Sequence, residues 1–187
     1  MFDFNNAKTQ RDLIPLDTIA TLQLSIKPGD CGEGKWLKKS KDGKSEGLDC
    51  EFTLVNSEHA KRKFWSRLTV SGETDGQKQA VDISRRTLRA ILESARGIKP
   101  DDMSESAKAA RQVEGWGDFD GIRFMGRIGV QPAQGQYGPK NILLEVITPD
   151  RKHWRRVEQR TNGAKPPHQS AATLAPAGEI VRPAWAR

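Results

Sequence analysis

The spacing of hydrophobic residues changes twice along this chain, from alternating to helical and back. Three early stretches alternate apolar and polar side chains, which is typical of half-buried β-strands. They are residues 18–30, 47–57 and 61–72. In residues 82–97 the apolar side chains recur every three or four residues, which predicts a helix capped by Ser84 and ended by Gly97. The strand pattern then returns in residues 121–131 and 140–150.

This order of elements matches a five-stranded barrel with a helix between strands three and four, the oligonucleotide/oligosaccharide-binding (OB) fold. A second, short helix is predicted over residues 101–112, so the insertion holds one or two helices. Ligands of this fold lie across strands two and three and under the first and last long loops. In this chain those loops are residues 32–47 and 132–139. We therefore expect a mainly β, OB-type domain.

The periodic pattern ends near residue 157. Residues 158–187 are rich in Pro, Ala, Gly and polar residues, so we predict a domain over residues 1–157 and a flexible basic tail over 158–187. Most of the net charge of +7 lies near this end, because residues 151–187 hold eight Lys or Arg and two acids. Trp185, near the C-terminus, is a candidate anchor for a partner protein. The alternatives are an arm that adds phosphate contacts and a tail without a ligand.

Several classes of protein are excluded by missing motifs. The sequence Gly-Lys-Ser at 43–45 resembles the end of a phosphate-binding loop, but such a loop needs a glycine where this chain has Lys38. It also needs a following helix, whereas a strand is predicted. Cys31 and Cys50 lack the spacing of a zinc site and fit reduced thiols. We expect no enzymatic activity, no metal and no cofactor. No apolar run reaches the roughly 20 residues of a membrane span, so we expect no membrane partner.

The third strand carries an unusual outer face. Inward Phe64 and Leu68 force Trp65 outward, together with Lys63 and Arg67. An outward indole between two cations suits single-stranded nucleic acid, because the ring stacks on a base while the cations meet phosphates.

Further candidates lie in the fourth strand and in the two long loops. In the fourth strand, Met125 and the two arginines beside it are expected to face outward. With the loop residues, the remaining candidate nucleic-acid-binding side chains are Lys35, Trp36, Lys38, Lys39, Arg123, Arg127, Tyr137 and Lys140.

The outer face of the third strand also has another interpretation. If strands two and three pair around residue 58, Glu51 lies opposite Trp65 and Asp49 lies opposite Arg67. These acids would then satisfy the cations, and Trp65 would pack under a loop or at a dimer contact.

Five stretches resemble an uncharacterised phage family: "MFDFNNA", the loop with glycines and lysines, "FWSRLTVSG", "TLRAILESARG" and "GIRFMGRIGVQ…YGPKNILLEVI". Its members occur in replication and recombination modules and resemble OB-type single-stranded-DNA-binding proteins. The similarity covers roughly residues 1–150. It implies DNA binding without catalysis, with Trp36, Trp65 and Tyr137 on base-stacking surfaces. Bacterial single-strand binders usually end in an acidic tip that recruits partners, whereas this chain ends in "RPAWAR".

We therefore predict a cytoplasmic protein of a bacterial or phage-infected host cell that binds single-stranded DNA with little sequence preference. It would act in DNA replication or recombination. The alternative is a non-catalytic OB-type adaptor that recruits a replication or recombination enzyme and binds DNA weakly or not at all. The sequence leaves open RNA binding, which depends on contacts to the 2′-hydroxyl, and assembly into a homo-oligomer.

Overall fold

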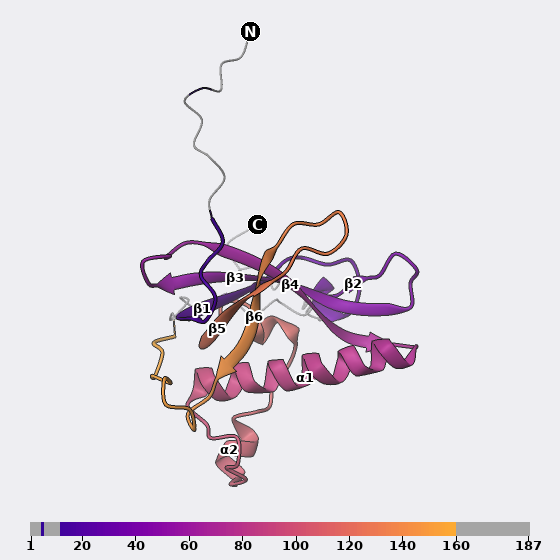
Figure 1. Cartoon of the computed structure of the whole chain (residues 1–187). Helices are drawn as coiled ribbons and strands as arrows, with labels where there is room; N and C mark the ends of the chain where they lie inside the picture. The colour runs from indigo at the N-terminus through magenta and orange to yellow at the C-terminus, as the bar shows by residue number, and fades with distance from the viewer. Residues whose placement is uncertain (1–4, 6–11, 160–187) are drawn as a thin grey trace, which may run out of the picture.

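The computed structural model describes residue 5 and residues 12–159, and it is built on a six-stranded antiparallel sheet (Figure 1). The strands are β1 Thr18–Ile26, β2 Lys38–Lys39, β3 Ser45–Asn56, β4 Lys63–Gly72, β5 Arg123–Gln131 and β6 Lys140–Ile147. The helices of this part are α1 Asp75–Arg96 and α2 Glu105–Ala109, with short 3-10 helices η1 Glu33–Lys35 and η2 Trp116–Phe119. The predicted mainly β chain with a helical insertion is confirmed.

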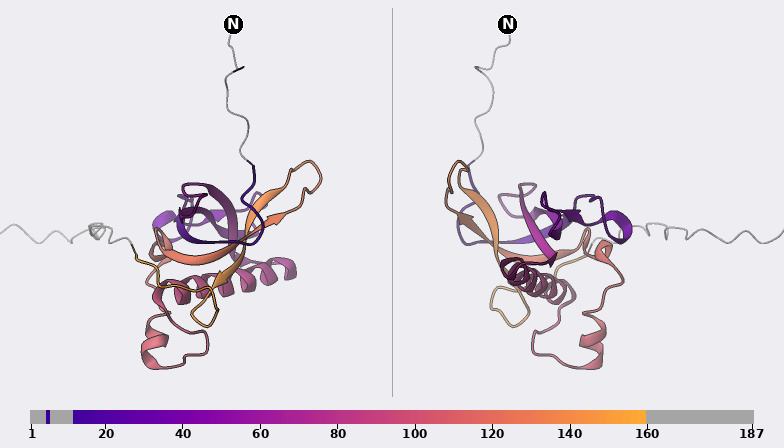
Figure 2. Two further views of the ribbon diagram at one scale, coloured as in Figure 1. Left: turned by 60° about the vertical axis from the view of Figure 1, so that its left-hand side comes forward. Right: turned by 90° about the vertical axis from the view of Figure 1, so that its right-hand side faces the viewer.

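β1 is the central strand of this sheet. It pairs with β3 on one side and with β5 on the other, while β4 pairs with β3, and β6 with β5. β4 and β6 come close to each other, but within the described residues no ladder joins them, so the sheet stays open there. α1 packs against β4, β5 and β6, and α2 projects beyond it, as Figure 1 and Figure 2 show from three directions.

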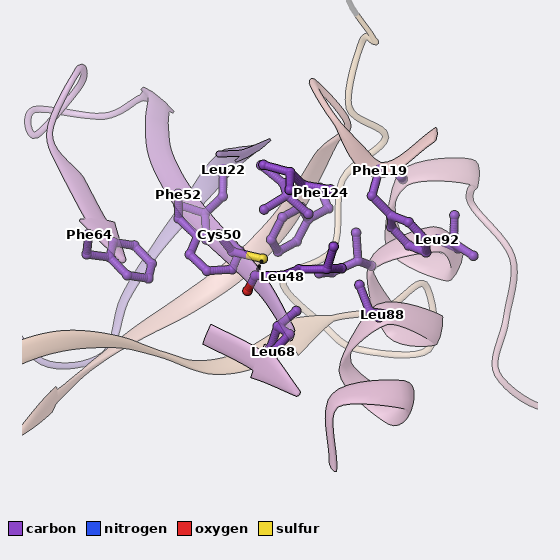
Figure 3. Close-up of a cluster of buried hydrophobic side chains, with 14 of the residues drawn as sticks. Leu22, Leu48, Cys50, Phe52, Phe64, Leu68, Leu88, Leu92, Phe119 and Phe124 are labelled. Carbon is purple, nitrogen blue, oxygen red and sulfur yellow. Dashed lines mark hydrogen bonds between the residues drawn. The ribbon is translucent and has the colours of Figure 1, made fainter. Parts of the chain in front are cut away.

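The inward residues of the alternating stretches form the main core. Phe52 stacks on Phe64 with ring centroids 5.1 Å apart, and it meets the edge of Phe124 at 6.1 Å (Figure 3). Leu22 of β1 and Leu88 of α1 join them in the same cluster. Burying each side chain of this size contributes about 1.5–3 kcal/mol. The apolar alternation therefore fixes which face of each strand turns inward.

α1 begins earlier than the apolar pattern predicts. The expected start at Ser84 is wrong, because a capping box places the first turn at Asp75. The Thr74 hydroxyl accepts a hydrogen bond from the Gln77 N–H, and the Gln77 side chain accepts one from the Thr74 N–H at 3.1 Å. Ser84 is buried inside the helix. The predicted end is confirmed, because Gly97 adopts the left-handed conformation (φ 72°).

Residues 148–159 fold back onto the sheet after β6. Val157 and Ile147 bury Met125, so the expected exposure of Met125 is wrong. Trp154 donates its indole N–H to the Ser94 carbonyl at 3.1 Å, and Gln159 donates to the Arg123 carbonyl at 2.8 Å. The first two residues of the predicted tail are thus in contact with β5. The rest of that tail, including Trp185, lies outside the described residues.

Candidate nucleic-acid interface

The outer face of β3 and β4 has the register that the sequence suggested. Glu51 lies opposite Trp65, and Asp49 lies opposite Arg67. Phe52 and Phe64 form the inward pair beside them. Because side chains alternate along a strand, burying these aromatic rings turns the charged neighbours outward.

Trp65 stands on this face with 52% of its surface exposed. Its indole N–H donates to Glu51 Oε2 at 3.0 Å, and Lys63 Nζ lies 2.7 Å from Glu51 Oε1. Lys27 Nζ lies 5.5 Å from the centroid of the Trp65 ring, within cation–π range. The hydrogen bond from Lys63, and to a lesser extent that from Trp65, holds the pKa of Glu51 below its ordinary value. Glu51 is therefore ionised at neutral pH and fixes the orientation of the indole.

Arg67 and Lys38 share the second acid of this face. Asp49 Oδ1 lies 3.6 Å from Arg67 Nη1, and Asp49 Oδ2 lies 3.5 Å from Lys38 Nζ. Arg67 Nη2 also donates to the Lys38 carbonyl at 2.6 Å. The Arg67 side chain passes over Gly47, where an added Cβ would lie 2.9 Å from Arg67 Nε. Arg67 thereby links β2 to the β3–β4 pair.

Trp36, the aromatic residue of the first long loop, packs partly against the main core. Trp36 is half-buried against the main core, and its ring lies over Gly117 of η2, where an added Cβ would be 3.1 Å from the ring. Lys35, in the left-handed region with φ 54°, and Lys39 are exposed. Lys35 and Lys39 are therefore displayed to solvent, while part of the Trp36 ring packs against the fold.

The two arginines of β5 are held by neighbours. Arg123 Nε donates to Gln23 Oε1 at 3.2 Å, and its Nη1 lies 3.5 Å from the Glu158 carbonyl. Arg127 lies between two acids, 3.7 Å from Asp17 and 3.4 Å from Glu145. Its Nε has no hydrogen bond with suitable geometry, so the contact with Glu145 is an ion pair only. Both side chains are half-buried.

A groove of about 640 Å³ lies between the first residues of β4 and the first residues of β6. It is lined by residues 12–13, 61–65 and 139–141, and we call it the β4–β6 groove. Trp65 forms one side, and the lining holds a single acid, Asp12. The four cations of the lining are Lys61, Arg62, Lys63 and Lys140.

Asn141 holds in place the segment before β1 whose residues 12–13 line this groove. Its Oδ1 accepts from the Ile14 N–H at 2.9 Å, while its Nδ2 donates to the Ile14 carbonyl at 2.8 Å and to the Gly129 carbonyl at 3.3 Å. Arg62 donates to the Asp12 carbonyl. These bonds place Leu13 beside the groove and bury Ile14 in the main core.

Tyr137 projects from the loop between β5 and β6, which leads into the groove. Its backbone forms a closed turn with Gln134 through hydrogen bonds of 2.9 and 3.0 Å. The side chain is 71% exposed, and Pro139, two residues later, lines the groove.

The structure gathers only some of the predicted residues. Lys63, Trp65 and Lys140 share the β4–β6 groove, while Lys38 and Arg67 meet at Asp49 on the β3–β4 face and do not line the groove. Trp36 and the two β5 arginines take part in other contacts. Sequence reasoning missed Lys61, Arg62 and the N-terminal side of the groove, although the cation run at 61–63 was a visible signal.

No protein-family model and no curated protein sequence matches this chain. In the part of the chain that the structure describes, none of the helices has the length and apolar character needed to cross a membrane. Among the same residues, no three His, Cys, Asp or Glu side chains are grouped as ligands of a metal ion. The exposed indole of Trp65 and the charges around it are the features of this face that bear on function.

Proposed function

We propose that this protein binds single-stranded DNA with little sequence preference, without catalysis, in DNA replication or recombination in a bacterial or phage-infected cytoplasm. The observation that carries the proposal is the β4–β6 groove, where a half-exposed indole stands among four cations and one acid. Bases of any sequence stack on an aromatic ring, and cations beside the ring attract the phosphates that follow.

The fold supports the proposal through its strand order. An OB barrel is a five-stranded Greek-key barrel that is partly open. Here β1, β3, β4, β5 and β6 are the five long strands, and the opening lies between β4 and β6. We infer that the chain is an OB-type domain whose ligand lies along this opening and under the loop that carries Tyr137.

Within this proposal, each group has a distinct role. Trp65 offers a free ring surface to one base, a contact that contributes about 1–3 kcal/mol. Tyr137, exposed near the same groove, offers a second platform. Lys61, Arg62 and Lys140 meet phosphates, and Lys35 and Lys39 of the first loop extend the basic surface.

One observation favours the adaptor as a second candidate function. Lys63, Arg67 and Lys38 each have an acid within 4 Å, so the charges on the β3–β4 face are partly compensated within the protein. A face of paired charges with a prominent tryptophan is also suited to a protein partner, because Trp is enriched among residues that dominate binding energy.

A fluorescence titration of the full chain with oligo-dT separates the two functions. We expect DNA to quench tryptophan emission and log Kd to rise linearly with log salt, as counterion release requires. Trp65→Ala should weaken binding roughly 5- to 150-fold, the equivalent of one lost base stack. Leu144→Ala is the matched control, because Leu144 is equally exposed at 51% but lies outside the groove.

Two results would refute DNA binding at this groove. The first is the absence of saturable binding at low salt. The second is a Trp65→Ala variant that binds oligo-dT as tightly as the Leu144→Ala control does.

A further inference from the structure

The acids of β3 occupy the donors that a phosphate would use on the β3–β4 face. Glu51 pairs with Lys63 Nζ at 2.7 Å and accepts a hydrogen bond from the Trp65 N–H at 3.0 Å. Asp49 forms ion pairs with Lys38 Nζ at 3.5 Å and with Arg67 Nη1 at 3.6 Å. Both acids lie two residues apart on one strand, so their side chains point to the same side of the sheet.

Displacing either acid would be unfavourable for a phosphate. Only 17% of the Glu51 side chain and 31% of the Asp49 side chain are exposed, so a displaced carboxylate stays poorly hydrated. The incoming phosphate would also stand beside a like charge. The charges of Lys63, Arg67 and Lys38 are therefore partly compensated from within the protein, by two acids for three cations.

Three of the four cations that line the β4–β6 groove differ in this respect. Within the described residues, Lys61, Arg62 and Lys140 have no carboxylate within 4 Å. Arg62 donates to a neutral carbonyl, which leaves its charge uncompensated. Three of the four groove cations are therefore uncompensated, whereas Lys38, Lys63 and Arg67 are paired with Asp49 and Glu51.

We propose that Asp49 and Glu51 act as internal competitors of phosphate, which keep a DNA strand off the β3–β4 face and direct it into the β4–β6 groove. This inference rests on the proposed function. It makes the two acids determinants of the path of the strand, and it leaves three groove cations, Lys61, Arg62 and Lys140, to displace counterions. For single strands, these three groove contacts contribute about −2 to the slope of log K against log salt.

Replacing one acid by its amide tests the competition directly. Glu51→Gln keeps the size of the side chain and an oxygen that can accept from Trp65, but it releases the charge of Lys63. With one more cation available, the salt slope should steepen by about 0.7, and affinity for oligo-dT at low salt should rise roughly three- to tenfold. Asp49→Asn releases two cations and should steepen the slope by up to about 1.4.

Glu105→Gln is the charge-matched control. Glu105 pairs with Lys108 at 2.7 Å, the same distance as Glu51 and Lys63, but on α2, which lies beyond α1 from the sheet (Figure 1). Glu105→Gln changes the net charge as much as Glu51→Gln does. Any difference in DNA affinity or salt slope between the two variants therefore depends on where the acid lies. The double variant Glu51→Gln/Lys63→Gln should return to the wild-type slope, because the released cation is gone.

The outcomes separate this inference from the proposed function. If the wild type binds oligo-dT while Glu51→Gln and Asp49→Asn match Glu105→Gln in slope and affinity, internal competition is refuted and DNA binding stands. If neither the wild type nor Glu51→Gln binds, both proposals fail. A steeper slope in Glu51→Gln that the double variant cancels supports the competition.

Discussion

Asn141 is the residue whose substitution should most affect residues 12–16, the segment before β1 that lines one side of the groove. It is 8% exposed and makes three hydrogen bonds to the backbone of Ile14 and Gly129. In Asn141→Ala, each buried group left without a partner destabilises the fold by about 1–3 kcal/mol. The alternative is that residues 12–16 detach, which exposes Ile14 and forfeits about 1.5–3 kcal/mol of burial.

The variant will adopt whichever of these two states has the lower free energy. Detachment of residues 12–16 therefore sets an upper limit on the loss of stability. We expect the free energy of unfolding to fall by about 2–3 kcal/mol, which lowers Tm by roughly 5–10 °C in a domain of this size. Thermal unfolding followed by circular dichroism measures this shift. Hydrogen exchange at residues 12–16 reports whether the segment has detached.

The control is Leu144→Ala in the same strand, which should change stability by less than about 0.5 kcal/mol because the side chain is exposed. If Asn141→Ala melts within about 1 °C of this control and Ile14 keeps its protection, the reasoning is refuted. In that case the hydrogen bonds of Asn141 do not hold the segment.

Two further predictions concern buried ionisable groups. Glu93 is almost fully buried and pairs with Arg89 at 2.8 Å and with Arg111 at 2.7 Å. Glu93→Ala leaves the largely buried Arg111 side chain without its acidic partner, so it should lower the free energy of unfolding in urea by about 3 kcal/mol. Arg89→Ala should lower it by less than about 1 kcal/mol, because half of that arginine is exposed. Equal effects would contradict the role of burial. Burial raises the pKa of the Cys50 thiol to about 12, so at pH 8 an aromatic disulfide reagent should modify Cys50 only after unfolding. Rapid modification in the native state would be inconsistent with its position in the core.

The sequence was sufficient wherever alternation and short turns determine structure. The inward Phe52 and Phe64 were visible as part of the alternation, and the short connection between β3 and β4 allowed the pairing of Glu51 with Trp65 to be predicted. Gly97 likewise marked the end of α1. These features depend on neighbours within a few residues, so local spacing contains the necessary information.

Features that depend on distant segments were not predictable in the same way. The first turns of α1 are polar, so an apolar pattern could not reveal a start that depends on Thr74 and Gln77. Met125 is covered by Val157, and no periodicity indicates which segment folds back over a strand. The groove combines residues 12–13 with residues 61–65 and 139–141, which only the complete sheet brings together.

The central place of β1 has a consequence for synthesis of the protein on the ribosome. β1 can pair with β3 as soon as residue 56 is available, but its other edge waits for β5, which ends at residue 131. About 75 residues separate the end of β3 from the end of β5, which corresponds to roughly 4–15 s of translation. During that interval an open strand edge faces solvent, where it can pair with other nascent chains. Slower translation through α1 should therefore increase aggregation of incomplete chains.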